Sequence, residues 1–192
     1  MLGGTFDPVH YGHIGIAEAV LNELDLEVVV FVVAADQWLR PAPPVASADD
    51  RLEMAMSAVE NTREFVVSDV DIARVGPTYT VDTLNDLRKW LGGGVELFLI
   101  VGADSALSMH RWDSAEAITS LARVVVVGRP GVKFDGRSLP ESHPAHGAEY
   151  VEGPMADVSA NAIRDRVREG DSLVGYVPQS VASYIEDEGL YR

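Results

Sequence analysis

The stretch VVVFVVA at residues 28–34 is a continuous run of mostly β-branched side chains. A run without polar alternation is typical of a strand that is buried on both faces of a parallel sheet. Residues 95–101 and 123–128 have the same character, and residues 65–68 form a shorter version. The chain therefore supplies several candidate strands for one buried sheet.

Helical patterns lie between and after these strands. Residues 13–24 place Ile14, Ala17, Leu21 and Leu24 on one stripe. Further helices are predicted for residues 47–61 with a Ser N-cap, 80–91 before a triple glycine, 113–121 with an Asp N-cap, 159–169 before a glycine, and 178–188 with a proline in the first turn. This alternation predicts an α/β fold, a Rossmann-like parallel sheet flanked by helices, with a small C-terminal helical region.

Composition restricts the class of protein. Of 192 residues, 47% are apolar and 23% are charged, which is typical of a globular chain, and we expect residues 1–192 to form a single domain. The longest apolar run is far shorter than the roughly 20 residues that span a bilayer, and no basic–apolar leader opens the chain. We therefore expect a cytoplasmic protein without a membrane partner. The absence of cysteine excludes disulfides and thiolate sites, and a net charge of −15 disfavours nucleic acid as a partner.

Three stretches interrupt the regular pattern. Residues 37–46 contain three prolines, and residues 129–147 are rich in Gly, Pro and His, so both are predicted to be long functional loops. Only Met1 and Leu2 precede the glycine pair at residues 3–4. We expect either a very short first strand or a strand that continues upstream of the sequence as given.

The first candidate binding motif is GGTFDPVHYGH at residues 3–13. Glycines let a phosphate approach the backbone, and a helix start attracts anions through its free N–H groups. If the helix begins near His10, then His10 and His13 share one face and could bracket the same phosphate. On spacing alone, a surface pair and a metal pair remain alternatives, although no third zinc ligand is evident.

The same stretch resembles the N-terminal signature GGTFDPxHxGH of the nucleotidylyltransferase superfamily, and most closely that of bacterial nicotinate-nucleotide adenylyltransferases. The resemblance implies that the glycines and histidines hold the triphosphate of ATP and that the histidines stabilise the transition state. It assigns ATP binding to Gly3, Gly4, Thr5, Phe6, His10 and His13, with both histidines catalytic. We interpret Asp7 and Pro8 as turn-forming residues.

The second candidate motif is VSANAIR at residues 158–164. Ser159 can cap a helix, and Arg164 follows within about two turns. A simple cap followed by a surface arginine is the alternative reading. The stretch resembles the family's second ATP motif, Ile-Ser-Ser-Thr-x-Ile-Arg, with Ala160 and Asn161 as departures. The resemblance implies ATP binding by Ser159, Asn161 and Arg164, and a catalytic role for Arg164.

Three features are candidates for the acceptor side. Thr80 lies where a turn enters a helix, Gly102 and Asp104 follow the strand predicted at residues 95–101, and Trp112 comes next. The carboxyl ends of parallel strands are where open α/β sheets bind ligands. The alternatives are a helix cap for Thr80, an N-cap for Asp104 and the cover of a core edge for Trp112.

These features resemble the Gly-Pro-x-Tyr-Thr, Gly-Ala-Asp and downstream Trp of the nicotinate branch. The resemblance implies that Thr80 and Trp112 hold the nicotinate ring and that Asp104, with Gly102 beside it, positions nucleotide. Arg129 follows the strand at residues 123–128 and is a candidate for the acceptor phosphate, with a turn residue as the alternative. The family's Pro-Pro-His-Lys-like segment is replaced by DQWLRP at residues 36–41, where only Arg40 supplies a positive charge.

The resemblance implies adenylyl transfer from ATP to nicotinate mononucleotide, which yields deamido-NAD and pyrophosphate in NAD biosynthesis. Mg²⁺ would accompany ATP without a dedicated protein metal site, and the partners would be ATP and a pyridine mononucleotide. Nicotinamide mononucleotide and phosphopantetheine are alternative acceptors. A non-catalytic nucleotide-binding module is a further alternative, and a homo-oligomer is compatible with the sequence. The acidic charge and the lack of a Lys-rich second loop oppose a tRNA-synthetase-like fragment.

Overall fold

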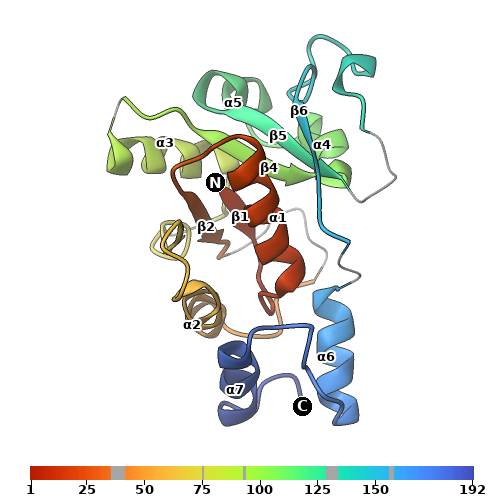
Figure 1. Ribbon diagram of the computed structural model, residues 1–192. Coiled ribbons are helices and arrows are strands. Elements are labelled where there is room, and N and C mark those ends of the chain that lie inside the picture. The colour runs from red at the N-terminus through yellow and green to blue at the C-terminus, as the bar shows by residue number, and fades with distance from the viewer. Residues whose placement is uncertain (36–41, 75, 93, 129–133, 156–157) are drawn as a thin grey trace.

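The computed structural model describes residues 1–192 except 36–41, 75, 93, 129–133 and 156–157. Its centre is a six-stranded parallel sheet in the order β3-β2-β1-β4-β5-β6 (Figure 1). The strands are β1 (Leu2–Gly4), β2 (Val29–Val33), β3 (Phe65–Ser68), β4 (Phe98–Gly102), β5 (Arg123–Gly128) and β6 (Glu149–Glu152). The helices are α1 (Tyr11–Glu23), α2 (Ala48–Val59), α3 (Thr80–Leu91), α4 (Ala103–Ser108), α5 (Ala115–Leu121), α6 (Ala160–Glu169) and α7 (Gln179–Asp187), with the 3₁₀ turns η1 (Met109–Arg111) and η2 (Gly136–Ser138). This arrangement confirms the predicted fold class.

The strand order places a topological switch point beside β1. Leu2 is in register with Phe31 of β2 on one side and with Ile100 of β4 on the other. The chain winds from β1 through β2 to β3, and then crosses to β4 on the opposite side of β1. Ligands in open α/β sheets bind at the carboxyl edge at such a point. The loop that follows Gly4 leaves the sheet there.

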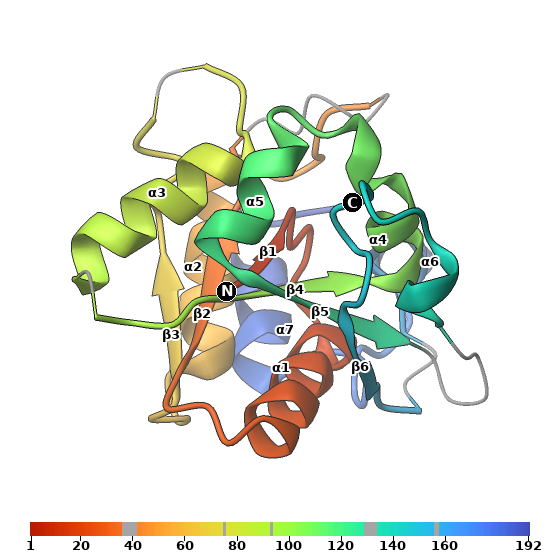
Figure 2. The ribbon, with the colours of Figure 1, turned by 90° about the horizontal axis from the view of Figure 1, so that it is seen from above.

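Alternating side chains of the sheet enter separate cores on its two faces. Strand β2 is buried at all of its positions, as predicted for a strand covered on both faces. Phe31 and Val33 join the larger core with α1, α2, α6 and α7, whereas Val30 and Val32 pack beneath α3. Helices α3 and α5 lie on one side of the sheet and α2, α6 and α7 on the other (Figures 1 and 2). The period of two along each strand accounts for this division.

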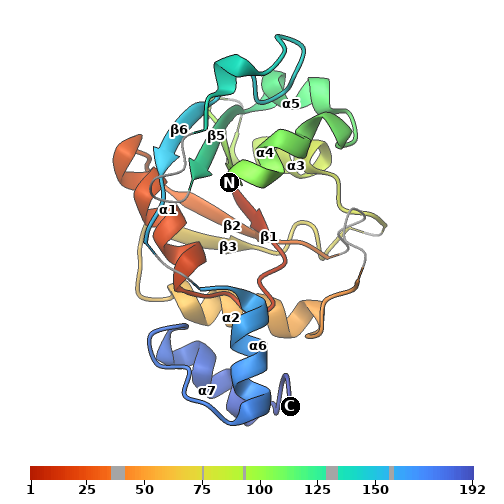
Figure 3. The ribbon, with the colours of Figure 1, turned by 90° about the vertical axis from the view of Figure 1, so that its right-hand side faces the viewer.

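The C-terminal helices form a layer beyond α2 (Figure 3). Tyr184 Oη donates to Asp50 Oδ1 at 3.1 Å, and Ser180 Oγ donates to the carbonyl of Ser57 at 2.9 Å. The side chains of Val181 and Ile185 are buried in the larger core. The predicted C-terminal helical region is therefore present and is attached through α2.

Most predicted helix ends are confirmed, because local capping chemistry determines them. Ser47 and Asp50 form a reciprocal capping box at the start of α2, and Gly92 follows the last residue of α3. Helix α1 begins two residues earlier than predicted, with His10 at its N-cap. The predicted Asp cap of α5 is wrong: the N-cap is Ser114, in a left-handed conformation with φ of 47° and without a side-chain capping bond.

Other differences concern short elements. Strand β4 begins at Phe98, three residues later than the predicted start, and neither α4 nor β6 was predicted. The first strand is a three-residue element, Leu2–Gly4, held between two neighbours. Within the described residues, no helix combines the length and hydrophobicity needed to cross a membrane.

Candidate active site

The loop at residues 5–10 connects the end of β1 to α1 at the switch point. A buried arginine of α2, Arg51, holds its start, with 1% of its surface exposed. Arg51 Nη1 donates to the carbonyls of Thr5 and Ala34, each at 2.7 Å. One buried guanidinium therefore joins the loops that follow β1 and β2.

Two histidines are stacked at the start of α1. The ring centroids of His10 and His13 lie 3.7 Å apart with 23° between the ring planes, and the Phe6 ring meets His13 edge-on at 4.9 Å. A Cβ atom at Gly12 would lie 2.9 Å from His10 Nδ1, so a larger residue there would displace the ring. The predicted common face of the two histidines is confirmed, and Gly12 makes the room for it.

The environment of His10 favours its neutral form. The side chain is 7% exposed, and burial lowers its pKa from 6.5 to about 4. Its Nδ1 atom has no hydrogen-bonding partner within the part of the chain that the structure describes. Buried polar atoms in proteins nearly always have a partner, so this nitrogen is available to a bound group.

The second motif reaches the first through Arg164. Ser159 caps α6 by accepting from the Ala162 N–H at 3.3 Å, as predicted. Arg164 Nη1 donates to the carbonyl of Asp7 at 2.6 Å, and its Nη2 donates to Asn161 Oδ1. The side chain is 18% exposed. The alternative of a surface arginine is therefore wrong, because the guanidinium lies against the loop that carries the histidines.

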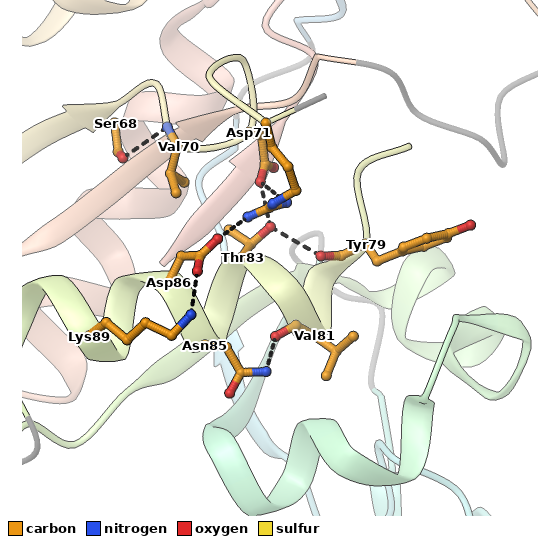
Figure 4. A network of polar contacts seen from close by, with 10 residues as sticks. Ser68, Val70, Asp71, Tyr79, Val81, Thr83, Asn85, Asp86 and Lys89 are labelled. Carbon is orange, nitrogen blue, oxygen red and sulfur yellow. Dashed lines mark hydrogen bonds and ion pairs between the residues drawn. The ribbon is translucent and has the colours of Figure 1, made fainter. Parts of the chain in front are cut away.

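The start of α3 brings Thr80 to the carboxyl edge of the sheet. The N-cap is Tyr79, without a side-chain capping bond, so the cap reading of Thr80 is wrong. A buried polar network fixes the helix instead (Figure 4): Thr83 Oγ1 donates to Asp71 Oδ1 at 2.6 Å, and Arg74 donates to both Asp71 and Asp86. Burial raises the pKa of Asp71, although these donors oppose the shift. Thr80 is itself half-buried.

The other acceptor-side candidates follow β4 and β5. Gly102 is the N-cap of α4, which makes the N-cap reading of Asp104 wrong, and Asp104 is exposed in the first turn. Trp112 is half-buried and packs against the core of α3 and α5, which confirms that it covers a core edge. Arg40 and Arg129 lie outside the described residues.

Among the residues that the structure describes, no group of three His, Cys, Asp or Glu side chains could hold a metal ion. The carboxylate closest in sequence to the histidines, Asp7, accepts hydrogen bonds from Val45, Ala46 and Tyr191. The described residues therefore do not form a group of protein ligands that could bind a cation beside the histidines.

Comparison with known proteins agrees with this geometry. A model of the cytidylyltransferase-like family matches residues 1–166. The chain is 42% identical to a probable nicotinate-nucleotide adenylyltransferase of Roseiflexus sp. (strain RS-1), over 100% of this chain and 96% of the relative. It is 40% identical to the corresponding Streptomyces coelicolor protein, over 100% and 99%. The chain belongs to the cytidylyltransferase-like family, among the nicotinate-nucleotide adenylyltransferases.

Solved structures show that this family's fold extends over the whole chain. Nicotinic acid mononucleotide adenylyltransferase of Plasmodium falciparum, complexed with NaAD, superposes with a TM-score of 0.78 at 19% identity, over 99% of this chain and 95% of that one. A putative nicotinate-nucleotide adenylyltransferase of Vibrio parahaemolyticus gives 0.70 at 16% identity, over 100% and 93%. Because the sequence identities are 19% and 16%, these superpositions show only that the folds are alike.

Two residues of this adenylyltransferase site were not found from the sequence. Asp7 was interpreted only as turn-forming, yet its side chain is buried and accepts three hydrogen bonds. Arg51 was overlooked within the amphipathic pattern of α2. The sequence does contain a signal for Arg51: it is a charged residue on the apolar side of the helix, between the capping box and Met54. Charged residues are seldom buried without a partner, so this position indicates a specific contact.

Proposed function

We propose that the chain transfers the adenylyl group of ATP to nicotinate mononucleotide, releasing pyrophosphate and forming deamido-NAD. The observation that carries the proposal is the stacked pair of His10 and His13. The pair lies at the start of α1 beside the switch point, next to the loop at residues 5–10 that Arg164 contacts. The relatives that align over the full chain are named for this activity.

The reaction needs no general base. The acceptor 5′-phosphate is already an anion, and its oxygen attacks the α-phosphorus of ATP in line with the departing pyrophosphate. One P–O bond forms, the bond between the α-phosphorus and the bridging oxygen breaks, and the electron pair leaves on pyrophosphate. Catalysis is then a matter of positioning the two phosphates and stabilising the charge that develops.

We assign the charge stabilisation to His10, His13 and Arg164. A neutral imidazole still donates one N–H group, and in a buried site such a bond is stronger than in water. In a chain of net charge −15, these groups and the amides of the loop supply the local attraction for a polyphosphate. Ser159 and Asn161 contribute from α6, and Gly3, Gly4, Thr5, Phe6, Gly102 and Asp104 complete the proposed ATP site.

We assign the acceptor site to residues that follow strands β3 and β4, whose carboxyl ends lie at the same edge of the sheet as the loop at residues 5–10. We propose that Thr80 and Trp112 hold the pyridine ring and that Asp104 binds ribose hydroxyls. Arg40 and Arg129 are proposed for the acceptor phosphate. Residues 1–192 would act together as one domain, since the two ATP motifs lie near opposite ends of the chain.

Magnesium is proposed to enter with ATP, held by phosphate oxygens and water. Mg²⁺ commonly keeps several waters and binds through substrate phosphates, and the described residues offer no carboxylate cage. When bound, the cation neutralises part of the phosphate charge.

A substrate panel tests the proposal. ATP and Mg²⁺ are supplied with nicotinate mononucleotide, nicotinamide mononucleotide or phosphopantetheine, and pyrophosphate release is followed. We expect the fastest release with nicotinate mononucleotide. Faster turnover with phosphopantetheine would assign a different transferase, and ATP binding without pyrophosphate release under any acceptor would indicate a non-catalytic module.

A further inference from the structure

Asp7 lies in the middle of the loop between β1 and α1, and its side chain is 5% exposed. Its carboxylate accepts three hydrogen bonds: from the N–H of Val45 at 2.8 Å, from the N–H of Ala46 at 3.1 Å, and from the hydroxyl of Tyr191 at 2.8 Å. These donors lie 38, 39 and 184 residues away along the chain. A buried carboxylate needs such partners. Here the donors come from two distant segments, residues 45–46 and the C-terminal segment, and they join both to the loop that carries Asp7.

The main chain of Asp7 adds a fourth segment. Its carbonyl accepts from Arg164 Nη1 at 2.6 Å, and the same nitrogen lies 3.7 Å from Asp7 Oδ2. Asp7 therefore contacts the arginine proposed for ATP while it stands three residues before His10. Through Val45 and Ala46 it also holds the end of the loop that follows β2.

Tyr191 anchors this arrangement from the C-terminal segment. Its side chain is 6% exposed, and its backbone adopts a left-handed φ of 66°. Burial and the negative charge of Asp7 raise the pKa of the Tyr191 hydroxyl well above its usual range. The segment follows α7, which packs against α2, the helix that carries Arg51.

We infer that Asp7 is a positioning residue for adenylyl transfer, and that Tyr191 holds its carboxylate so that the C-terminal segment helps to position the loop at residues 5–10 and Arg164. This inference rests on the proposed function. Asp7 acts through Arg164 and the loop, because its carboxylate oxygens already receive donors from the protein. A displacement of about 1 Å at a reacting group can cost a hundredfold in rate, so such an anchor matters for catalysis.

The chain offers a matched pair of tyrosines for the test. Tyr191 donates to Asp7 and Tyr184 donates to Asp50, both from the C-terminal region to a carboxylate. Tyr191→Phe and Tyr184→Phe each remove one hydroxyl and leave the ring. Steady-state kinetics with ATP and nicotinate mononucleotide are measured for both variants, together with their urea unfolding midpoints.

We expect Tyr191→Phe to raise the KM for ATP about fivefold, because only part of the tenfold or greater effect of a hydrogen bond to a charged group is transmitted to the ATP site, while Tyr184→Phe leaves both KM values within twofold of wild type. In an Asp7→Ala background, which removes the acceptor, the effect of Tyr191→Phe should disappear, because Tyr191 acts through Asp7. Tyr191→Phe should also unfold at a lower urea concentration than Tyr184→Phe, because it leaves a buried carboxylate short of one donor.

Equal KM and kcat values for the two phenylalanine variants would overturn the positioning role and leave adenylyl transfer by the wild type intact. Absence of pyrophosphate release from the wild type would instead overturn the proposed function, and the positioning role with it. If Asp7→Ala does not fold, the comparison of the two tyrosines still decides the question.

Discussion

The two halves of the proposed site are built differently. On the ATP side, the buried Arg51 and the half-buried Arg164 donate to carbonyls of the loop at residues 5–10, and the buried Asp7 of that loop accepts from a distant segment. On the acceptor side, Asp104 is exposed and Trp112 is half-buried, and the polar network that fixes α3 lies one turn behind its first residue. The difference indicates that the protein's own contacts fix the loop at residues 5–10, whereas the residues proposed for the acceptor side are half-buried or exposed.

The largest effect is expected at the ATP side. His13→Ala should lower kcat at least about a hundredfold, because one charge-stabilising donor is lost in the transition state. His146, which is exposed and donates from Nδ1 to the Leu139 carbonyl, provides the control. His146→Ala should leave kcat within twofold of wild type in the same pyrophosphate assay. A loss of less than threefold in a folded His13→Ala variant would remove the histidine from the mechanism.

The burial of His10 should appear in the pH dependence of stability. The pKa is about 4 in the folded chain and 6.5 ordinarily, so between these values the unfolded chain binds a proton that the folded chain does not. Stability should therefore fall as pH falls from 6.5 to 4, with a contribution of up to about 1.4 kcal/mol per pH unit from His10. Urea unfolding of wild type and His10→Gln across this range isolates the contribution, and identical slopes would show that His10 titrates normally.

A smaller effect is expected at the acceptor side. Trp112→Ala should raise the KM for nicotinate mononucleotide about fivefold, since stacking on an aromatic ring contributes roughly 1 kcal/mol or more. The KM for ATP should remain unchanged. The exposed Trp90 provides the control, and Trp90→Ala should alter neither KM. If Trp112→Ala lowers only the unfolding midpoint, the tryptophan contributes to the core alone and does not bind the ring.

The parts of the fold that were predicted correctly depend on local chemistry. The capping box of Ser47 and Asp50, the cap at Ser159 and the glycine after α3 are readable within a few residues. Strand β6 was missed because its sequence EYVE buries one side chain, Val151, and becomes a strand by pairing with β5. Tertiary pairing, rather than propensity, determines that element.

The candidate site divides in the same way. The motif at residues 3–13 predicted the histidine pair, since helical spacing alone places both rings on one face. The position of Arg51 on the apolar side of α2 indicates its burial, but the partners of Asp7 and Arg51 are not predictable, because they are distant in sequence and only the folded chain brings them together. The acceptor residues Arg40 and Arg129 remain predictions.

The central claim is that the stacked histidines hold the polyphosphate of ATP. A crystal structure with a non-hydrolysable ATP analogue and Mg²⁺ tests it most directly. The account predicts a ring nitrogen of both His10 and His13 within about 2.7–3.2 Å of phosphate oxygens, with Arg164 on the same group. As a control, ATP and acceptor replace the analogue in the crystal, and turnover there shows that the crystallised protein is active. Phosphates bound away from both rings in such an active crystal would contradict the claim.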